Sequence, residues 1–251
     1  MTGTRQLGFC FSILGLLLIN WVALAEGRPQ LNPFTAEYSL SRGYLKLAKV
    51  EITLELDDHG AYRYSARTTP VGLTAVLHSD EISEVSSGTI GAEGVIPQRY
   101  HYRHHNSTNP RSVDLDFDWR ARRVTNSLDG ASWSMKIAPG TQDKFSQQLM
   151  LMLSLAAGKR KIDFPVADGG RAKDYSFRFQ SEEIVDIDAG SFHTLKIARS
   201  KNRRSSQTSL WLAPRINYLP VIVEKKEKDG IYLMELNRFS WIAPSVQEQD
   251  Q

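Results

Sequence analysis

The sequence contains almost no cysteine: Cys10 is the single one among 251 residues. One cysteine cannot form a disulfide within the chain, so the fold must depend on its apolar core. A large exported bacterial domain can do so, whereas a small extracellular module usually cannot. Cys10 also lies in an N-terminal segment that we expect to be removed. The mature chain then has no cysteine, which excludes thiol catalysis and cysteine-ligated zinc.

Recognisable catalytic and nucleotide-binding motifs are also missing. The chain has no GxSxG, SxxK, HExxH, GxGxxG or P-loop pattern. The stretch GTIGAEG (88–94) has the wrong spacing for a dinucleotide fingerprint and lies between strand-like segments, so its glycines indicate turns. Active sites are assembled in space, so this absence favours a non-enzymatic protein but leaves a hydrolase open. We expect no cofactor and no bound metal.

The chain also lacks an excess of one charge. Its 31 basic and 28 acidic residues become 30 and 28 when Arg5 is removed with the N-terminal segment. This balance argues against nucleic acid as a partner. Basic residues cluster at 119–123, 201–206 and 224–229. Such clusters are typical of solvated loop ends, or of a rim that meets lipid phosphates through peripheral membrane contact.

Only one long apolar run is present, at the N-terminus. Arg5 precedes the run from Leu7 to Val22, and the sequence Ala-Leu-Ala at 23–25 has the small-x-small pattern that signal peptidase accepts. We expect cleavage after Ala25 and a periplasmic location. An uncleaved membrane anchor is the alternative, because the run approaches the length of a spanning helix. The remainder predicts a single β-rich domain over 26–244 and a flexible tail over 245–251.

Beyond the leader the dominant hydrophobic period is two, which is typical of antiparallel strands. Turn residues separate the strand-like segments. We therefore predict an all-β, mainly antiparallel fold, an open or half β-barrel with one substantial helix near the middle of the chain. The segments are 34–41, 49–57, 61–68, 111–119, 132–138, 175–180, 192–200 and 208–213.

The helix is predicted over 143–158, with its body at 145–157. This stretch has no β-branched residue, is rich in leucine and methionine, and ends at Gly158, a typical residue after a helix. Thr141 or Asp143 is expected to cap its first turn. Its apolar residues exceed one narrow stripe, so the helix either covers a ligand groove or fills a closed barrel. The groove candidates here are Leu149, Met150, Met152 and Leu153.

The stretch YHYRHHN (100–106) brings three histidines close together in sequence. Side chains alternate along a strand, so His101 and His105 take one face while His104 takes the other, and the cluster is unsuited to zinc. We predict a hairpin with a turn at 107–110, an aromatic face and an ionic face. In the predicted register Arg99 lies opposite Asp118, His101 opposite Asp116, and Arg103 opposite Asp114.

The stretch from 211 to 239 is interpreted as the corner of a sheet. Pro214 ends one strand because proline lacks an N–H for the ladder, and Asp229-Gly230 indicates a hairpin turn. None of its residues has the character of a catalytic nucleophile. Trp211, Tyr218 and Leu219 are predicted to pack in the core or to line an apolar cavity.

These stretches together carry a resemblance. The tryptophan-ended strand, the corner WLAPRIN, the restart YLPV and the DG hairpin resemble the exported bacterial family called domain of unknown function 3108. The stretches FTAEYSLSRGYLKLAKVEITLE, VIPQRYHYR and GTQDKFSQQLMLML agree with it. This family has no assigned activity, so the resemblance implies export and a β-rich fold but no catalytic residue. The corner hairpin alone is similar to periplasmic lipoprotein carriers of the LolA and LolB type, open half-barrels that hold acyl chains.

Two classes of function follow from these features, and a third stays open. The first is a periplasmic carrier that holds a lipid or another hydrophobic envelope component in an apolar groove. The second is an envelope hydrolase using residues such as Asp143, His193 or His78. The third is a structural adaptor that binds another envelope protein through a sheet edge. The carrier is the function we predict.

The leader generates the first testable prediction. Ala25→Arg destroys the small-x-small site, so we expect unprocessed protein that keeps its leader. Mass spectrometry of the N-terminus of the wild type in its native host should show a chain that starts at Glu26. A wild-type chain that starts at Met1 would contradict this interpretation and favour the anchor.

Overall fold

The structure is a computed structural model that describes residues 30–72, 74–75, 81–105, 110–200 and 207–243. The expected leader, the tail and the basic cluster at 201–206 therefore lie outside the described residues. So does the predicted hairpin turn, except for Pro110. Every strand of the described chain belongs to one sheet.

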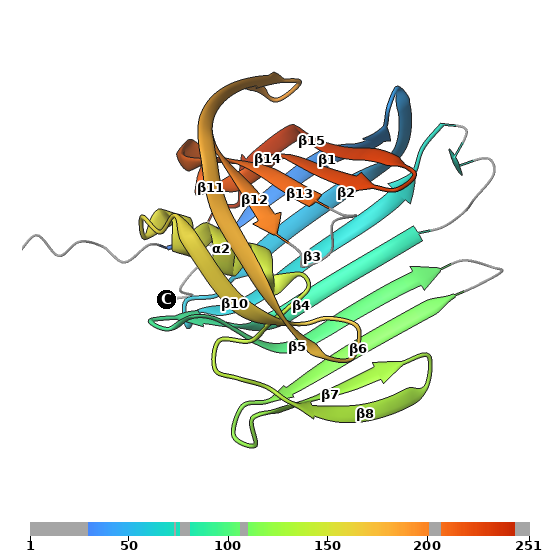
Figure 1. The fold of residues 1–251 in the computed structure, drawn as a ribbon, viewed down its shortest axis with the longest axis vertical. Helices are drawn as coiled ribbons and strands as arrows, with labels where there is room; N and C mark the ends of the chain where they lie inside the picture. Colours follow the sequence, from blue (N-terminus) through green and yellow to red (C-terminus); the bar gives the residue numbers. More distant parts are fainter. Residues whose placement is uncertain (1–29, 73, 76–80, 106–109, 201–206, 244–251) are drawn as a thin grey trace, which may run out of the picture.

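The first half of the chain is an antiparallel meander in which each strand pairs with the next (Figure 1). In parts of β1, β2 and β3, buried residues alternate with more exposed ones, as the period of two predicts. Its strands are β1 (Phe34–Arg42), β2 (Leu45–Leu56), β3 (Ala61–Pro70), β4 (Glu81–Gly91), β5 (Gly94–His105), β6 (Arg111–Asp118), β7 (Arg123–Leu128) and β8 (Ala131–Lys136).

The second half forms another antiparallel meander, which joins the first through the pairing of β1 with β15. The short strand β9 (Gln142–Asp143) is the exception, because it pairs with β10 in parallel. The other elements are α2 (Ser146–Ala156), β10 (Lys161–Ala167), β11 (Ala172–Ile187), β12 (Gly190–Ser200), β13 (Gln207–Ala213), the 3₁₀ turn η1 (Pro214–Ile216), β14 (Leu219–Glu227) and β15 (Gly230–Trp241).

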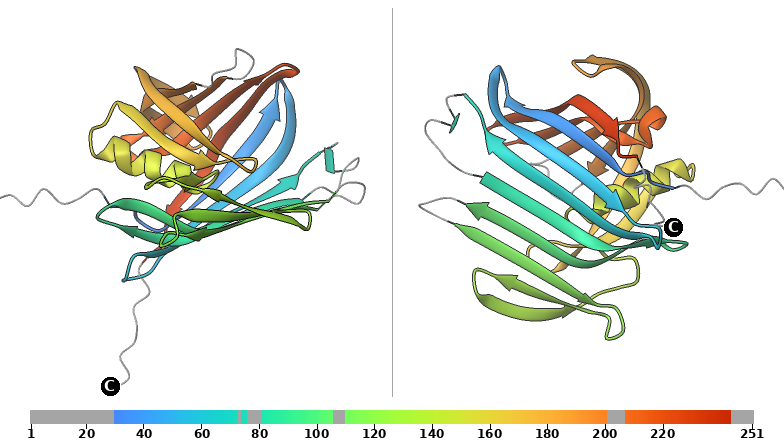
Figure 2. Two further views of the ribbon diagram at one scale, coloured as in Figure 1. Left: turned by 60° about the horizontal axis from the view of Figure 1, so that its bottom comes forward. Right: turned by 180° about the vertical axis from the view of Figure 1, so that it is seen from behind.

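The resulting sheet of 15 strands is open, with β8 at one end and β9 at the other. The sheet curls so that its two halves face one another, and α2 lies between them (Figure 2). This confirms the predicted β-rich open barrel with one substantial helix. Among the described residues, no helix is both long enough and apolar enough to cross a membrane.

The helix α2 is buried on more than one side. Leu149 and Met152 belong to a large core cluster with the aromatic side chains of β1, β3 and β5, whereas Leu151 and Leu155 belong to a second cluster with β10 to β13. These four side chains have exposed fractions of 0 to 1%. The excess apolar surface that the sequence shows is thus used to pack both halves of the sheet.

The buried carboxylate of Asp143 fixes the start of α2 and joins it to β4. Its Oδ1 accepts hydrogen bonds from the backbone N–H groups of Phe145 and Ser146, both at 2.7 Å. Its Oδ2 accepts a hydrogen bond of 2.6 Å from the Ser86 hydroxyl, which also contacts the Tyr62 hydroxyl at 2.9 Å. The predicted capping role of Asp143 is confirmed. Thr141 instead donates its hydroxyl to the Ala138 carbonyl.

The corner between β13 and β14 is confirmed as well. Pro214 opens the turn η1, and Asn217 and Tyr218 both have positive φ values, at 56° and 58°. The Tyr218 N–H closes the turn on the Ala213 carbonyl at 2.9 Å. At the far end of β14, Glu227 pairs with Gly230, so the two turn residues are Lys228 and Asp229, one residue earlier than the predicted Asp229-Gly230.

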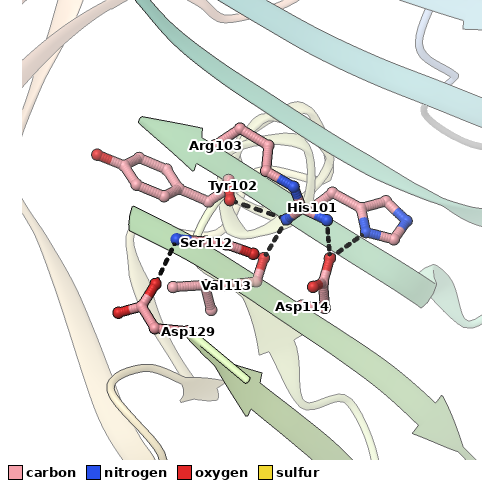
Figure 3. Close-up of polar contacts among 7 residues, drawn as sticks. All are labelled: His101, Tyr102, Arg103, Ser112, Val113, Asp114 and Asp129. Atoms are coloured by element: carbon pink, nitrogen blue, oxygen red, sulfur yellow. Dashed lines mark hydrogen bonds and ion pairs between the residues drawn. The ribbon is translucent and has the colours of Figure 1, made fainter. Parts of the chain in front are cut away.

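The hairpin of β5 and β6 has the predicted faces but a different register (Figure 3). Arg99 lies opposite Asp116 and His101 lies opposite Asp114, a displacement of two residues from the prediction. A slip of two leaves every side chain on its predicted face. Asp114 accepts hydrogen bonds from the His101 ring at 2.6 Å and from Arg103 at 2.7 Å. Burial raises the pKa of Asp114, but these hydrogen bonds outweigh it and the net pKa is lowered.

The position of Asp143 generates a prediction about pH. Burial raises the pKa of this carboxyl above its ordinary value, although the hydrogen bond from Ser86 and the backbone N–H groups oppose the rise. The folded state therefore holds the proton more tightly than the unfolded chain does. This contribution to stability is complete below the ordinary pKa and is lost as pH rises through the folded pKa.

Asp143→Asn removes this titration. The free energy of unfolding of the wild type minus that of the variant should fall with rising pH. The fall is about 1.4 kcal/mol for each factor of ten by which the folded state binds the Asp143 proton more tightly than the unfolded chain does. Urea unfolding at a series of pH values measures it. Ser86→Ala removes a hydrogen bond that favours the carboxylate and so raises the folded pKa, so in that background the fall should continue to a higher pH. A difference that stays constant or grows with pH would contradict a raised pKa.

Candidate functional site

A pocket of about 260 Å³ lies where the two ends of the open sheet approach one another. One wall is the inner face of β5 to β8, and the other comes from the turn before α2 and the turn after β10. These two walls come from separate parts of the sequence, so no local sequence pattern predicts the site. The lining residues are Tyr100, Tyr102, Arg111, Val113, Leu115, Asn126, Leu128, Trp133, Lys144, Ala167, Asp168, Gly169 and Gly170.

The sheet wall of the pocket is mainly apolar. Val113 lies opposite Leu128, and Leu115 lies opposite Asn126, so these side chains share one face of β6 and β7. Trp133 lies opposite Asn126 on the neighbouring strand and is 37% exposed. This wall offers a surface on which hydrocarbon or a ring can displace water.

Trp133 also links the two ends of the sheet. Its indole Nε1 donates a 3.2 Å hydrogen bond to the Gly170 carbonyl, which belongs to the turn between β10 and β11. Gly170 has φ 77°, and a Cβ atom there would lie 2.4 Å from the indole ring. Glycine is therefore required both by the backbone conformation and by the close approach of the tryptophan.

The rim of the pocket carries charged groups. Lys144 and Arg111 are both exposed and supply two cations. Asp168 supplies one anion, which accepts hydrogen bonds from Lys173 at 2.7 Å and from Tyr175 at 3.1 Å. Burial raises the pKa of Asp168, but Lys173, Lys144 and Tyr175 together lower it below its ordinary value. The carboxylate is thus charged and already held by protein donors.

Two tyrosines complete the floor. The Tyr100 hydroxyl donates a 2.5 Å hydrogen bond to Glu84. Burial, followed by the nearby Glu84 carboxylate, raises the pKa of Tyr100 and also that of Tyr102, and Arg111 opposes the rise at Tyr102. Both phenols therefore stay neutral in the physiological range and act as hydrogen-bonding groups. Among the residues that the structure describes, no serine, threonine or histidine lines this pocket.

A second pocket of about 430 Å³ lies over β1, β2 and β15. It is larger but more open, and its charged side chains already pair with one another. Glu37 contacts Arg238 at 2.7 Å and Lys49 at 2.5 Å, and these contacts lower the pKa of the Glu37 carboxyl. The smaller pocket is the better candidate because it combines an apolar wall with exposed cations.

The groove residues predicted from the sequence lie elsewhere. Neither described pocket is lined by any of them. Met150 and Tyr218 are partly buried, and the other five have exposed fractions of 9% or less. Their part in binding a ligand stays a prediction. The five are Leu149, Met152, Leu153, Trp211 and Leu219.

Trp211 has a defined polar environment on β13. Its Nε1 donates a 2.7 Å hydrogen bond to Glu183, and the Lys196 ammonium lies 4.6 Å from its ring centroid. Met150 packs beside Gly94 at the start of β5. Trp211 belongs to the same core cluster as the helix residues Leu149, Met152 and Leu153, and its indole also contacts Glu183 on β11 and Lys196 on β12.

The residues considered for hydrolysis are not assembled into one site. Asp143 is fully buried in the hydrogen-bond network of α2. The His193 side chain is exposed on β12, where its Nε2 lies 3.2 Å from Glu182. His78 lies outside the described residues. Within the part of the chain that the structure describes, no group of three or more histidine or acidic side chains could hold a metal ion.

Comparisons with known proteins agree with the fold. The structure is similar to a β-barrel-like protein of the domain of unknown function DUF1849 from Brucella abortus, with a TM-score of 0.59 and 13% identity. That likeness covers 85% of this chain and 99% of the other, and it shows the fold alone. A protein from Parabacteroides distasonis described as a candidate lipoprotein has a TM-score of 0.35 and 10% identity, covering 84% and 97% of the two chains.

No curated protein matches the sequence. The similarity of the corner hairpin to LolA and LolB stays a prediction. Residues 36–237 match the family described as protein of unknown function DUF3108, and this match covers most of the chain. The chain therefore belongs to the DUF3108 family.

Proposed function

We propose that this protein is a non-enzymatic binding protein of the periplasm that holds an anionic, amphipathic, lipid-like molecule in the pocket between β5–β8 and the turn after β10. The observation that supports this function is the lining of that pocket. Apolar side chains from β6 to β8 form the wall, and Lys144 and Arg111 lie at its rim.

The size of the pocket limits how much of a ligand it holds. A water molecule occupies about 30 Å³ in the liquid, so a volume of about 260 Å³ corresponds to roughly nine groups of that size. This matches a short acyl chain, or the part of a longer lipid next to its head group. The rest of a longer chain would extend past Trp133, which is partly exposed.

The charges favour an anion over a cation. Asp168 already accepts hydrogen bonds from Lys173 and Tyr175, whereas Lys144 projects into solvent from the turn before α2. A carboxylate or phosphate at the rim gains charge-assisted hydrogen bonds from such cations. The apolar part of the ligand then contacts Val113, Leu115 and Leu128.

An adaptor that binds another envelope protein is the second candidate function. The observation that favours it is the position of β8 at one end of the sheet, where one edge of this strand has no neighbouring strand within the described part of the chain. Five of its six residues are exposed. A partner would then add an extended strand to β8.

Lys144→Glu tests the binding function, because Lys144 is exposed and its substitution should leave the fold intact. We expect the variant to bind a fluorescent fatty acid about tenfold more weakly, a loss of about 1.4 kcal/mol. Binding of the uncharged methyl ester of the same probe should be unchanged. Fluorescence titration of the purified protein measures both affinities.

Lys159→Glu is the matched control, since Lys159 is exposed and lies outside the pocket. It should bind both probes as the wild type does. Leu128→Trp fills the pocket and should weaken both probes alike. If the wild type binds neither probe, or if the two lysine variants behave alike, the pocket is not the ligand site. Loss of a copurifying protein in a variant with proline in β8 would then favour the adaptor.

A further inference from the structure

Two neighbouring hairpin ends carry a small, strongly exposed apolar patch. Tyr44 and Leu45 lie at the end of the β1–β2 hairpin and are 108% and 49% exposed, and Ile231 lies at the end of the β14–β15 hairpin and is 47% exposed. The two ends are adjacent because β1 pairs with β15, with Arg42 opposite Tyr232. Large side chains exposed together in this way indicate an interaction surface.

Arg42 holds the two hairpin ends against one another. Its guanidinium donates a hydrogen bond to the Asp229 carbonyl, lies 3.3 Å from the Asp229 carboxylate, and stands 5.6 Å from the centroid of the Tyr232 ring. The Tyr232 hydroxyl in turn donates to the Asp229 carboxylate at 2.7 Å. Tyr44, Leu45 and Ile231 are therefore presented as one unit, not as two independent loop ends.

The surroundings of the patch are cationic. Lys225 pairs with Glu227 at 2.7 Å, and Lys226 lies 3.5 Å from Glu224. Lys46 and Lys228 are exposed and make no ion pair with any residue in the described ranges. The hairpin ends thus keep two positive charges beyond those that the acidic residues neutralise.

We propose that these hairpin ends dock on an anionic lipid bilayer, with Tyr44, Leu45 and Ile231 at the level of the head groups and Lys46 and Lys228 contacting lipid phosphates. A patch of three side chains is too small for a stable protein interface, which needs about 800 Å² on each partner. A bilayer surface has no such requirement. Aromatic and aliphatic side chains partition into its interface, and nearby cations are attracted to its anionic phosphates.

The patch lies at the same end of the sheet as one side of the pocket. Neighbouring strands of the first meander are antiparallel, so β1, β5 and β7 run in the same direction. Their C-terminal ends carry Arg42, Tyr102 and Leu128, the last two of which line the pocket. Docking would therefore place this side of the pocket toward the membrane, although the docking itself does not depend on ligand binding.

Vesicle cosedimentation with the full chain tests the proposal. Wild type should bind vesicles of phosphatidylcholine and phosphatidylglycerol at least tenfold more tightly than vesicles of phosphatidylcholine alone, and high salt should weaken the binding. Tyr44→Ser combined with Leu45→Ser should weaken it about tenfold, and Lys46→Glu combined with Lys228→Glu should do the same. All variants share one N-terminal segment, so differences among them report the hairpin ends alone.

Ile184→Ser is the matched apolar control, because Ile184 on β11 is 72% exposed and lies away from the hairpin ends. It should bind vesicles as the wild type does. An equal loss in Ile184→Ser and in the Tyr44 and Leu45 variant would overturn the proposal, as would equal binding to the two kinds of vesicle. A dimer that the Tyr44 and Leu45 substitutions abolish, without vesicle binding, would assign the patch to a second copy of the chain.

Discussion

The hydrogen bonds of the buried Asp143 carboxylate hold together two parts of the chain that strand pairing leaves apart. Pairing runs continuously from β8 to β9, but it does not close the sheet. Closure is replaced by side-chain links: Asp143 with Ser86, the Gln142 amide with the Val95 carbonyl at 2.8 Å, and the Trp133 indole with Gly170. These links position α2 between two core clusters, and the helix then buries the inner faces of both halves.

The pocket is a consequence of this incomplete closure. A barrel closed by strand pairing would bring β8 against β9 and leave no space between them. Here the end of the sheet formed by β5 to β8 contacts the turn after β10 through Trp133. Residues from both sides line the remaining gap. Because the wall comes from strand faces and the rim comes from turns, the wall is apolar and the rim is charged. The same arrangement that leaves the sheet open therefore gives the site its amphipathic character.

The sequence predicts the elements of this fold much better than it predicts their assembly. Alternating side chains locate many of the strands, although β4, β7 and β10 were not among the predicted segments. The absence of β-branched residues locates α2, and Pro214 locates the corner. The register of β5 and β6 differs by two residues because both registers keep the same faces, so the pattern cannot distinguish them. The pocket could not be predicted, because Trp133 and Gly170 meet only in the folded chain. Leu149 and Met152 were candidates for a groove because the apolar sequence pattern of a helix is the same whether its side chains contact the core or a ligand.

A crystal structure of the protein soaked with a saturated fatty acid of about ten carbons tests the central claim most directly, since the pocket holds roughly nine water-sized groups. The account predicts density for the carboxylate beside Lys144 or Arg111 and for the chain along Val113, Leu115 and Leu128. Density confined to the open pocket at Glu37 and Arg238, or among the α2 side chains, would contradict it. An unoccupied pocket at saturating fatty acid would contradict it equally.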